Sequence, residues 1–165
     1  MKEAIGGTWL FQIVIVFILL FTGFMCLSIN RSKAFNVKNY ILETIQTYNG
    51  DKDAAMKDIV AYMKSNSYRT VGVRPNAITL THCNKKIDYT CYNREGKVDN
   101  KNSPVFCLAK IPVDSNGGCG GGDFSELPSM FYYRIDVFYQ LDLPFFHDLF
   151  NFHITGDTRM FSVSS

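Results

Sequence analysis

Residues 9–29 read WLFQIVIVFILLFTGFMCLSI, and this run contains no charged side chain. As a helix, its 21 residues would extend about 31 Å, close to the hydrocarbon thickness of a bilayer, about 30 Å. A helix in a soluble core is rarely apolar on every face, and a secretory signal usually has a shorter apolar region with a small-residue cleavage site behind it. The sequence Ile29-Asn30-Arg31 is a poor cleavage site. We therefore expect residues 8–29 to form a retained, single-pass transmembrane helix.

The apolar pattern continues beyond this segment as one face of a helix. Its members recur near helical spacing at Phe35, Tyr40, Ile41, Ile45 and Tyr48. Asn49-Gly50 then supplies a stop, because glycine is favoured just after a helix end. The pattern predicts an amphipathic stem helix at residues 30–49, continuous with the membrane segment, and leaves residues 1–7 as a short cytoplasmic leader.

The remainder, residues 50–165, is long enough for one compact core. Asp51 or Asp53 can cap a short second helix, which has apolar residues at i, i+3, i+4 and i+7 and ends near Asn66. The period then changes to two, which predicts strands at residues 69–73, 77–82, 88–92, 104–112, 131–141 and 150–161. Helices followed by antiparallel strands indicate an α+β fold, here with a long N-terminal helix.

Four of the five cysteines lie in this domain, at Cys83, Cys91, Cys107 and Cys119. An even number in a small domain beside a membrane predicts one or two disulfides, with three complete connectivities open, and hence an oxidising, extracytoplasmic compartment. Reduced structural thiols are the alternative, and a zinc site using His82 is disfavoured because no ligand pair has the usual short spacing. The basic residues Arg31, Lys33 and Lys38 argue for the opposite orientation, since positive charge favours the cytoplasmic side.

Several function classes are not supported by the sequence. The net charge is only +2 and the basic residues are scattered, so we expect no nucleic-acid partner. The three histidines, His82, His147 and His153, lie in no recognisable nucleophile motif. The glycine-rich residues 114–123 lack the ending of a phosphate-binding loop. We therefore expect a protein that is not an enzyme and has no cofactor and no metal.

Gln12 is a polar residue inside the apolar run, and it stands five residues after Gly7. An amide in lipid is costly unless it finds a partner, so such residues often mark contacts between helices. The arrangement resembles type IV prepilins, in which a leader ending in glycine precedes an apolar helix with an acid at its fifth residue. The resemblance implies cleavage between Gly7 and Thr8 by a prepilin peptidase, with glutamine in place of the acid at position 12.

The C-terminal end resembles TadE-like pseudopilins of the tight-adherence pilus, a type IV-related secretion system. The similarity lies in the strand YRIDVFY at residues 133–139, the Leu143-Pro144 loop and the final segment LFNFHITGDTRMF at residues 149–161. It implies a pilin-like structural subunit in the cell membrane, in contact with lipid, with other pilin-like subunits and with a pilus assembly platform. We expect Gln12, Phe35, Ile41 and Ile45 to form the helix–helix assembly face. The alternative is a membrane-tethered extracytoplasmic binding or sensor domain.

Overall fold

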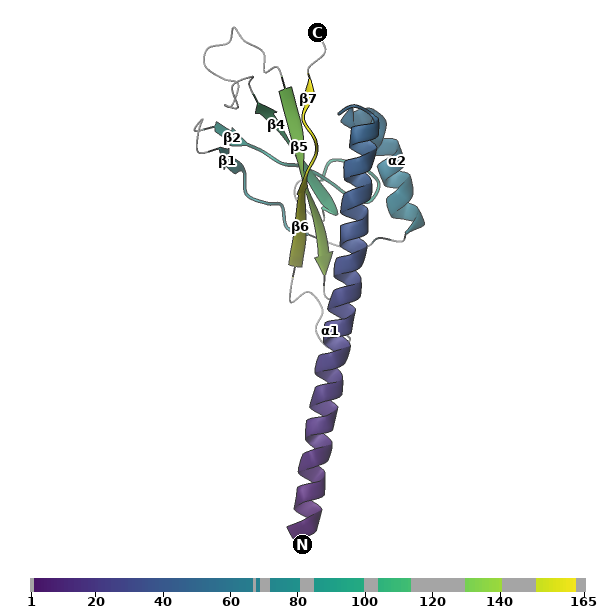
Figure 1. Cartoon of the computed structure of the whole chain (residues 1–165), viewed down its shortest axis with the longest axis vertical. Coiled ribbons are helices and arrows are strands. Elements are labelled where there is room, and N and C mark those ends of the chain that lie inside the picture. Colours follow the sequence, from purple (N-terminus) through teal and green to yellow (C-terminus); the bar gives the residue numbers. More distant parts are fainter. Residues whose placement is uncertain are drawn as a thin grey trace.

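The structure is a computed structural model that describes residues 2–66, 68, 72–80, 85–99, 104–113, 130–140 and 151–162. A long helix rises from the N-terminus, and all other elements gather around its far end (Figure 1). In chain order the elements are α1 (Lys2–Thr47), α2 (Lys52–Ser65), β1 (Ile78–Leu80), β2 (Lys85–Ile87), β3 (Thr90–Tyr92), β4 (Phe106–Val113), β5 (Met130–Gln140), β6 (Asn151–Asp157) and β7 (Phe161–Ser162). The predicted α+β fold is confirmed.

Helix α1 ends where the sequence indicated, and backbone hydrogen bonds close its last turn. Asn49 adopts a left-handed conformation (φ 52°), and Gly50 follows at φ 85°. The Asn49 amide donates to the Gln46 carbonyl and the Gly50 amide to the Ile45 carbonyl, which satisfies two helix-end carbonyls in a Schellman motif. Asp51 immediately caps α2, because its carboxylate accepts hydrogen bonds from the amides of residues 53 and 54. The two helices therefore form a tight hairpin.

Strands β3, β4, β5 and β6 form an antiparallel sheet in that order, and β7 also pairs with β5. The predicted single strand at residues 150–161 is wrong, since it is two strands, β6 and β7. Between the pairs Arg134–Asp157 and Phe131–Phe161, β5 advances three residues and its partner four. This extra residue is a β-bulge, and the backbone and hydroxyl of Thr158 bond to Tyr133 there.

The main core lies where α1 passes between α2 and the sheet (Figure 1). The second half of α1 contributes Ala34, Val37, Ile41 and Ile45, all buried. The sheet contributes alternate residues of β5, as expected for a strand with a period of two, and α2 contributes its apolar face: Tyr133, Ile135, Val137 and Tyr139 from β5, and Ala55, Ile59 and Met63 from α2. Helix α1 is thus the centre of the domain as well as its N-terminal extension.

The opposite face of the sheet carries a second, smaller core. Its buried members include Ile87, Tyr89, Cys91, Cys107 and Phe138, next to the separate β1–β2 hairpin. Strand β2 was not predicted. The described part of the predicted strand at residues 69–73 is not a strand, and its Gly72 lies directly against the Phe138 ring, where an added Cβ would be 2.0 Å from Cγ.

Candidate assembly surface on the first helix

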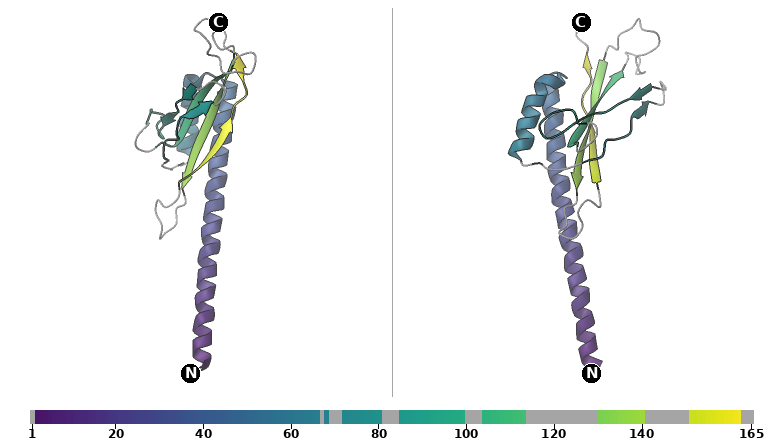
Figure 2. Two further views of the ribbon diagram at one scale, coloured as in Figure 1. Left: turned by 90° about the vertical axis from the view of Figure 1, so that its left-hand side faces the viewer. Right: turned by 180° about the vertical axis from the view of Figure 1, so that it is seen from behind.

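The N-terminal half of α1 stands clear of the domain. The chain from Thr8 to Thr47 is the one helix, among the described residues, that is long and apolar enough to cross a membrane, and its most apolar window has no buried residue. Both side views in Figure 2 show this part of the helix extending alone beyond the sheet. Large apolar side chains are exposed all around it, for example Phe17, Ile18 and Leu20. Such a surface requires an apolar solvent or other apolar helices.

A polar contact marks the point where the free helix meets the domain. The Asn30 side-chain amide donates a 2.8 Å hydrogen bond to the carbonyl of Gln140, the last residue of β5. One turn earlier, Leu27 is the first helix residue to pack against the main core. Among the described residues, contacts with the main core therefore begin at Leu27. Residues 8–26, about 28 Å of helix, lie outside the packed domain and are called the free half below, and residues 27–47 belong to the domain. No sequence signal distinguished Asn30 from any other polar residue after a membrane segment.

Two polar side chains in the free half differ in how their hydrogen-bonding groups are used. The Thr22 hydroxyl donates to the Ile18 carbonyl at 2.7 Å, so it is satisfied within its own helix. Gln12 is exposed on the helix surface, and within the described part of the chain its amide has no hydrogen-bond partner. Thr8 is exposed and helical, and Gly7 is part of the same helix. An amide in this situation gains most from a partner on another helix.

The structure gives Ile41 and Ile45 an intramolecular role. Both are 0% exposed within the domain's own core, so they cannot also contact a neighbouring subunit. Phe35, expected on the same face, is 48% exposed and lies under the Lys38 ammonium, 4.4 Å from the ring centroid. The buried positions are instead Ala34 and Val37, because Phe35 is turned about 100° from its neighbours on an α-helix. The predicted assembly face therefore loses Ile41 and Ile45, while Gln12 and the exposed Phe35 stay a prediction.

Two of the four candidate cysteines form a disulfide. Cys91 and Cys107 are opposite one another on β3 and β4 and are bonded at 2.04 Å, fully buried. This result rules out the zinc alternative for these two residues. Cys83 and Cys119 lie outside the described residues, as does His82. Cys26, in α1, is a thiol whose sulfur accepts a hydrogen bond from the Asn30 side-chain amide at 4.0 Å.

A buried polar group beside the disulfide was missed in the sequence. Asp136 pairs with Cys107 in the sheet register and is only 2% exposed, although it alternates along β5 with residues of the main core. Its carboxylate accepts a 2.5 Å hydrogen bond from the Thr155 hydroxyl on β6. Burial and a hydrogen bond to Asp136 both raise the pKa of Tyr89, which keeps that phenol protonated and donating. The burial of Asp136 follows from the second core, which the strand alternation alone does not predict.

A polar pair stabilises the same face further along the strands. The Arg134 guanidinium forms two hydrogen bonds with the Asp157 carboxylate, at 2.8 and 2.9 Å. This bidentate contact raises the pKa of Arg134 above its usual value. The residues are register partners on β5 and β6, so they join the two strands by side chains as well as by backbone.

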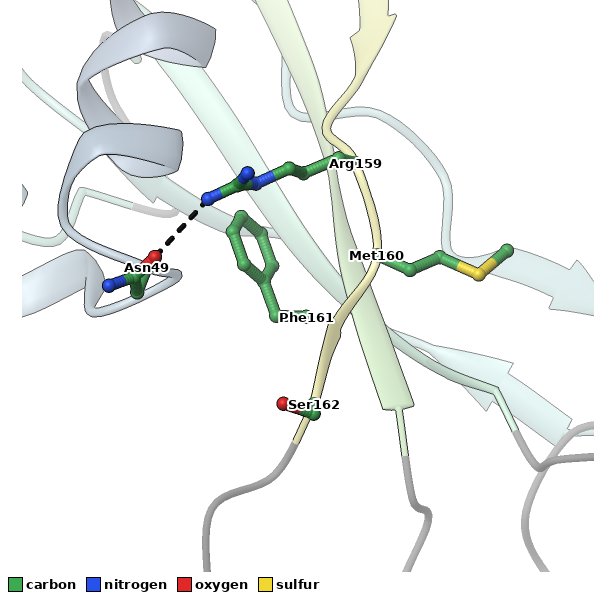
Figure 3. Close-up of a pocket in the computed structure, with 5 residues that line it drawn as sticks. All are labelled: Asn49, Arg159, Met160, Phe161 and Ser162. Atoms are coloured by element: carbon green, nitrogen blue, oxygen red, sulfur yellow. Dashed lines mark hydrogen bonds between the residues drawn. The ribbon is translucent and has the colours of Figure 1, made fainter.

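A shallow pocket of ≈ 430 Å³ lies at the membrane-distal end, where α1 turns into α2 (Figure 3). It is lined by Asn49, Arg159, Met160, Phe161 and Ser162. Arg159 donates to the Gln46 carbonyl at 3.1 Å and to Asn49 Oδ1 at 3.2 Å, so its guanidinium serves the C-terminal end of α1. The polar residues that line the pocket therefore mainly join the segment before β7 to the turn between α1 and α2.

The described residues assemble no catalytic constellation. His153 is exposed and meets the Phe138 ring edge-on, with 6.4 Å between ring centroids. His147 lies outside the described residues. Within the described part of the chain, no three His, Cys, Asp or Glu side chains gather to hold a metal ion. Comparisons with protein-family models, with curated proteins and with solved structures find no match to this chain.

Proposed function

We propose that this protein is a pseudopilin-like structural subunit, anchored in the membrane by α1 and built into a tight-adherence-type pilus or secretion apparatus. The observation that carries the proposal is the double use of one helix. Residues 27–47 of α1 form the centre of the domain, while residues 8–26 expose apolar side chains on all sides. Such a subunit can pack its free helix against equivalent helices and carry its domain outward in a fixed direction.

The absence of a linker between anchor and domain, within α1, supports assembly over simple tethering. A domain that only has to stay near a membrane can hang from a flexible segment. Here the helix is continuous from Lys2 to Thr47, and Asn30 pins the sheet to it at the point of exit. A shift or rotation of the free helix would therefore move the whole domain with it, which suits an ordered array of subunits.

Gln12 is the residue proposed to bond across helices. Its amide has two donors and one acceptor in an apolar surrounding and no partner within the described chain. A partner on a neighbouring helix would stabilise association by roughly 1 kcal/mol, in addition to van der Waals packing. The proposed partners are other pilin-like subunits and the assembly platform in the membrane, with no role for nucleic acid.

We place the domain outside the cytoplasm. The disulfide between Cys91 and Cys107 supports this side, because disulfides are rare in reducing compartments. Arg31 and Lys33 favour the opposite side by the positive-inside tendency. The disulfide receives more weight here, since the charge tendency is a statistical bias with only a few residues on either flank.

The test of assembly compares Gln12→Leu with Thr22→Val in the full-length protein, in membranes of its natural host. We expect the wild type to migrate in blue-native gels as complexes larger than a monomer, together with other helix-anchored subunits. Gln12→Leu should weaken these complexes, and Thr22→Val should leave them intact because its hydroxyl bonds within its own helix. A monomeric wild type, or equal behaviour of both variants, would contradict the proposal and favour a tethered binding domain.

Processing at the proposed leader is tested by the intact mass of the protein isolated from membranes. If a prepilin peptidase acts on the chain, the mature protein begins at Thr8. A mass that includes residues 1–7 would exclude this partner while leaving the assembly proposal to the Gln12 test. The same measurement, made with and without reduction, reports how many disulfides the protein holds, and a non-reduced peptide map shows whether one of them joins Cys91 to Cys107.

A further inference from the structure

We propose that Arg31 and Lys33, on opposite flanks of α1, each bind an anionic phospholipid headgroup and so hold the base of the domain against the bilayer. The inference rests on the membrane span of α1 and does not depend on assembly into a pilus. It concerns residues 31–33 of α1, within the first two turns of the packed half.

The position of these residues relative to the bilayer follows from the helix itself. Residues 8–29 extend about 33 Å, which fills the hydrocarbon layer. Arg31 and Lys33 then stand about 3 to 6 Å beyond its edge, within a headgroup layer about 5 to 7 Å thick. Because α1 continues without a break and Asn30 bonds to Gln140, the base of the sheet lies at the same level.

The side chains of Arg31 and Lys33 are both available. Both are exposed, and neither forms an ion pair with any described residue. The helix has no acidic residue between Glu3 and Glu43 to neutralise them. At 100° per residue they diverge by about 200°, so they emerge on opposite flanks of the face that packs on the sheet.

A lipid phosphate is the group that each of these two side chains would bind. Arginine and lysine at a membrane surface attract acidic lipids, and the interaction reaches little further than one Debye length. Lys38 is set higher and is already engaged, with its ammonium over Phe35 and its alkyl chain against Gly156. The proposed site therefore consists of Arg31 and Lys33 alone.

The experiment uses the full-length protein in phosphatidylcholine vesicles that contain a trace of spin-labelled lipid. The fraction of motionally restricted label gives the association constant of phosphatidylglycerol relative to phosphatidylcholine. For the wild type at low salt we expect a preference for phosphatidylglycerol of roughly 5-fold per basic residue, falling as salt is added. R31Q/K33Q should bring the ratio close to one, and R31K/K33R should retain the preference.

The matched control is K57Q/K86Q, which removes the same charge from exposed positions in the first half of α2 and on β2, toward the end of the domain away from the free half. We expect the control to keep the wild-type ratio. The proposal is overturned if the wild type shows no preference for phosphatidylglycerol. It is equally overturned if K57Q/K86Q lowers the ratio as much as R31Q/K33Q, or if R31K/K33R loses it.

Discussion

The two halves of α1 have the same backbone and opposite surroundings. Residues 8–26 expose apolar side chains on every side and lie outside the core that the described residues form, whereas residues 27–47 bury one stripe and expose the rest. In the first half, hydrogen bonds within the helix satisfy the backbone amide and carbonyl groups, as a lipid surrounding requires. In the second half, stability comes from packing against the sheet and α2. A continuous helix therefore joins two parts that depend on different solvents.

The sharpest test of this difference places the same charge in each half. Ile45→Asp buries a carboxylate in the main core, where the native side chain is 0% exposed, and should cost at least about 4 kcal/mol and unfold the domain. Ile18→Asp should leave the domain folded and instead impair membrane insertion, by about 2.5 to 3.5 kcal/mol. Protease resistance of the domain and carbonate extraction from membranes would separate the two failures. A folded Ile45→Asp domain would contradict the burial described above.

Removal of the disulfide tests how much the second core, on the face of the sheet away from α1, stabilises the domain that surrounds the packed half of α1. Replacing Cys91 and Cys107 by alanine opens a loop with a sequence separation of 16 and should cost about 3 kcal/mol. Thermal unfolding of the domain, followed by near-ultraviolet circular dichroism, would measure this loss. Membrane insertion should be unchanged, because both cysteines are remote from the free half. A variant that melts like the wild type would show that the bond contributes little.

Two glycines allow a comparison with opposite expected signs. Gly156 on β6 faces α1 so closely that an added Cβ would be 3.0 Å from Lys38 Cδ and 3.1 Å from Leu42 Cδ1. Gly156→Ala should therefore cost about 1 to 2 kcal/mol, since the helix side chains have to shift. Gly23→Ala, in the free half, should be neutral or stabilise the helix by about 0.5 to 1 kcal/mol. Chemical unfolding of the domain and helix content would report the two effects, and a stabilising Gly156→Ala would argue against close packing there.

The smallest expected effect lies at the boundary of the two halves. Asn30→Ala removes the hydrogen bond to the Gln140 carbonyl and should destabilise the lower end of the sheet by about 1 kcal/mol. Faster amide exchange at the last residues of β5 would detect it, with Ser28→Ala, an exposed neighbour, as the control. If exchange is unchanged, the sheet end is held by apolar packing near Leu27 instead.

The features that depend on neighbouring residues in the sequence were predicted well. The membrane segment, the stop at Asn49-Gly50, the Asp51 cap and the inward face of β5 all follow from local hydropathy or turn chemistry. The predicted stem stripe includes Phe35, which is exposed, and omits Ala34 and Val37, which are buried, because which helix positions are covered depends on where the sheet and α2 pack. Strand β2 and the break between β6 and β7 were missed, because they depend on partners distant in sequence.

The sequence alone determined that this chain has a long apolar N-terminal helix and an α+β domain, because hydrophobic length and periodicity are local properties. It also limited the cysteines that could form a disulfide to the four in the domain. Only the tertiary structure decided that Cys91 pairs with Cys107, that Asp136 is buried, and that Ile41 and Ile45 serve the domain's own core. Burial and pairing depend on which residues the sheet and α2 place opposite each position. The pattern of one strand or helix does not specify which element packs against it.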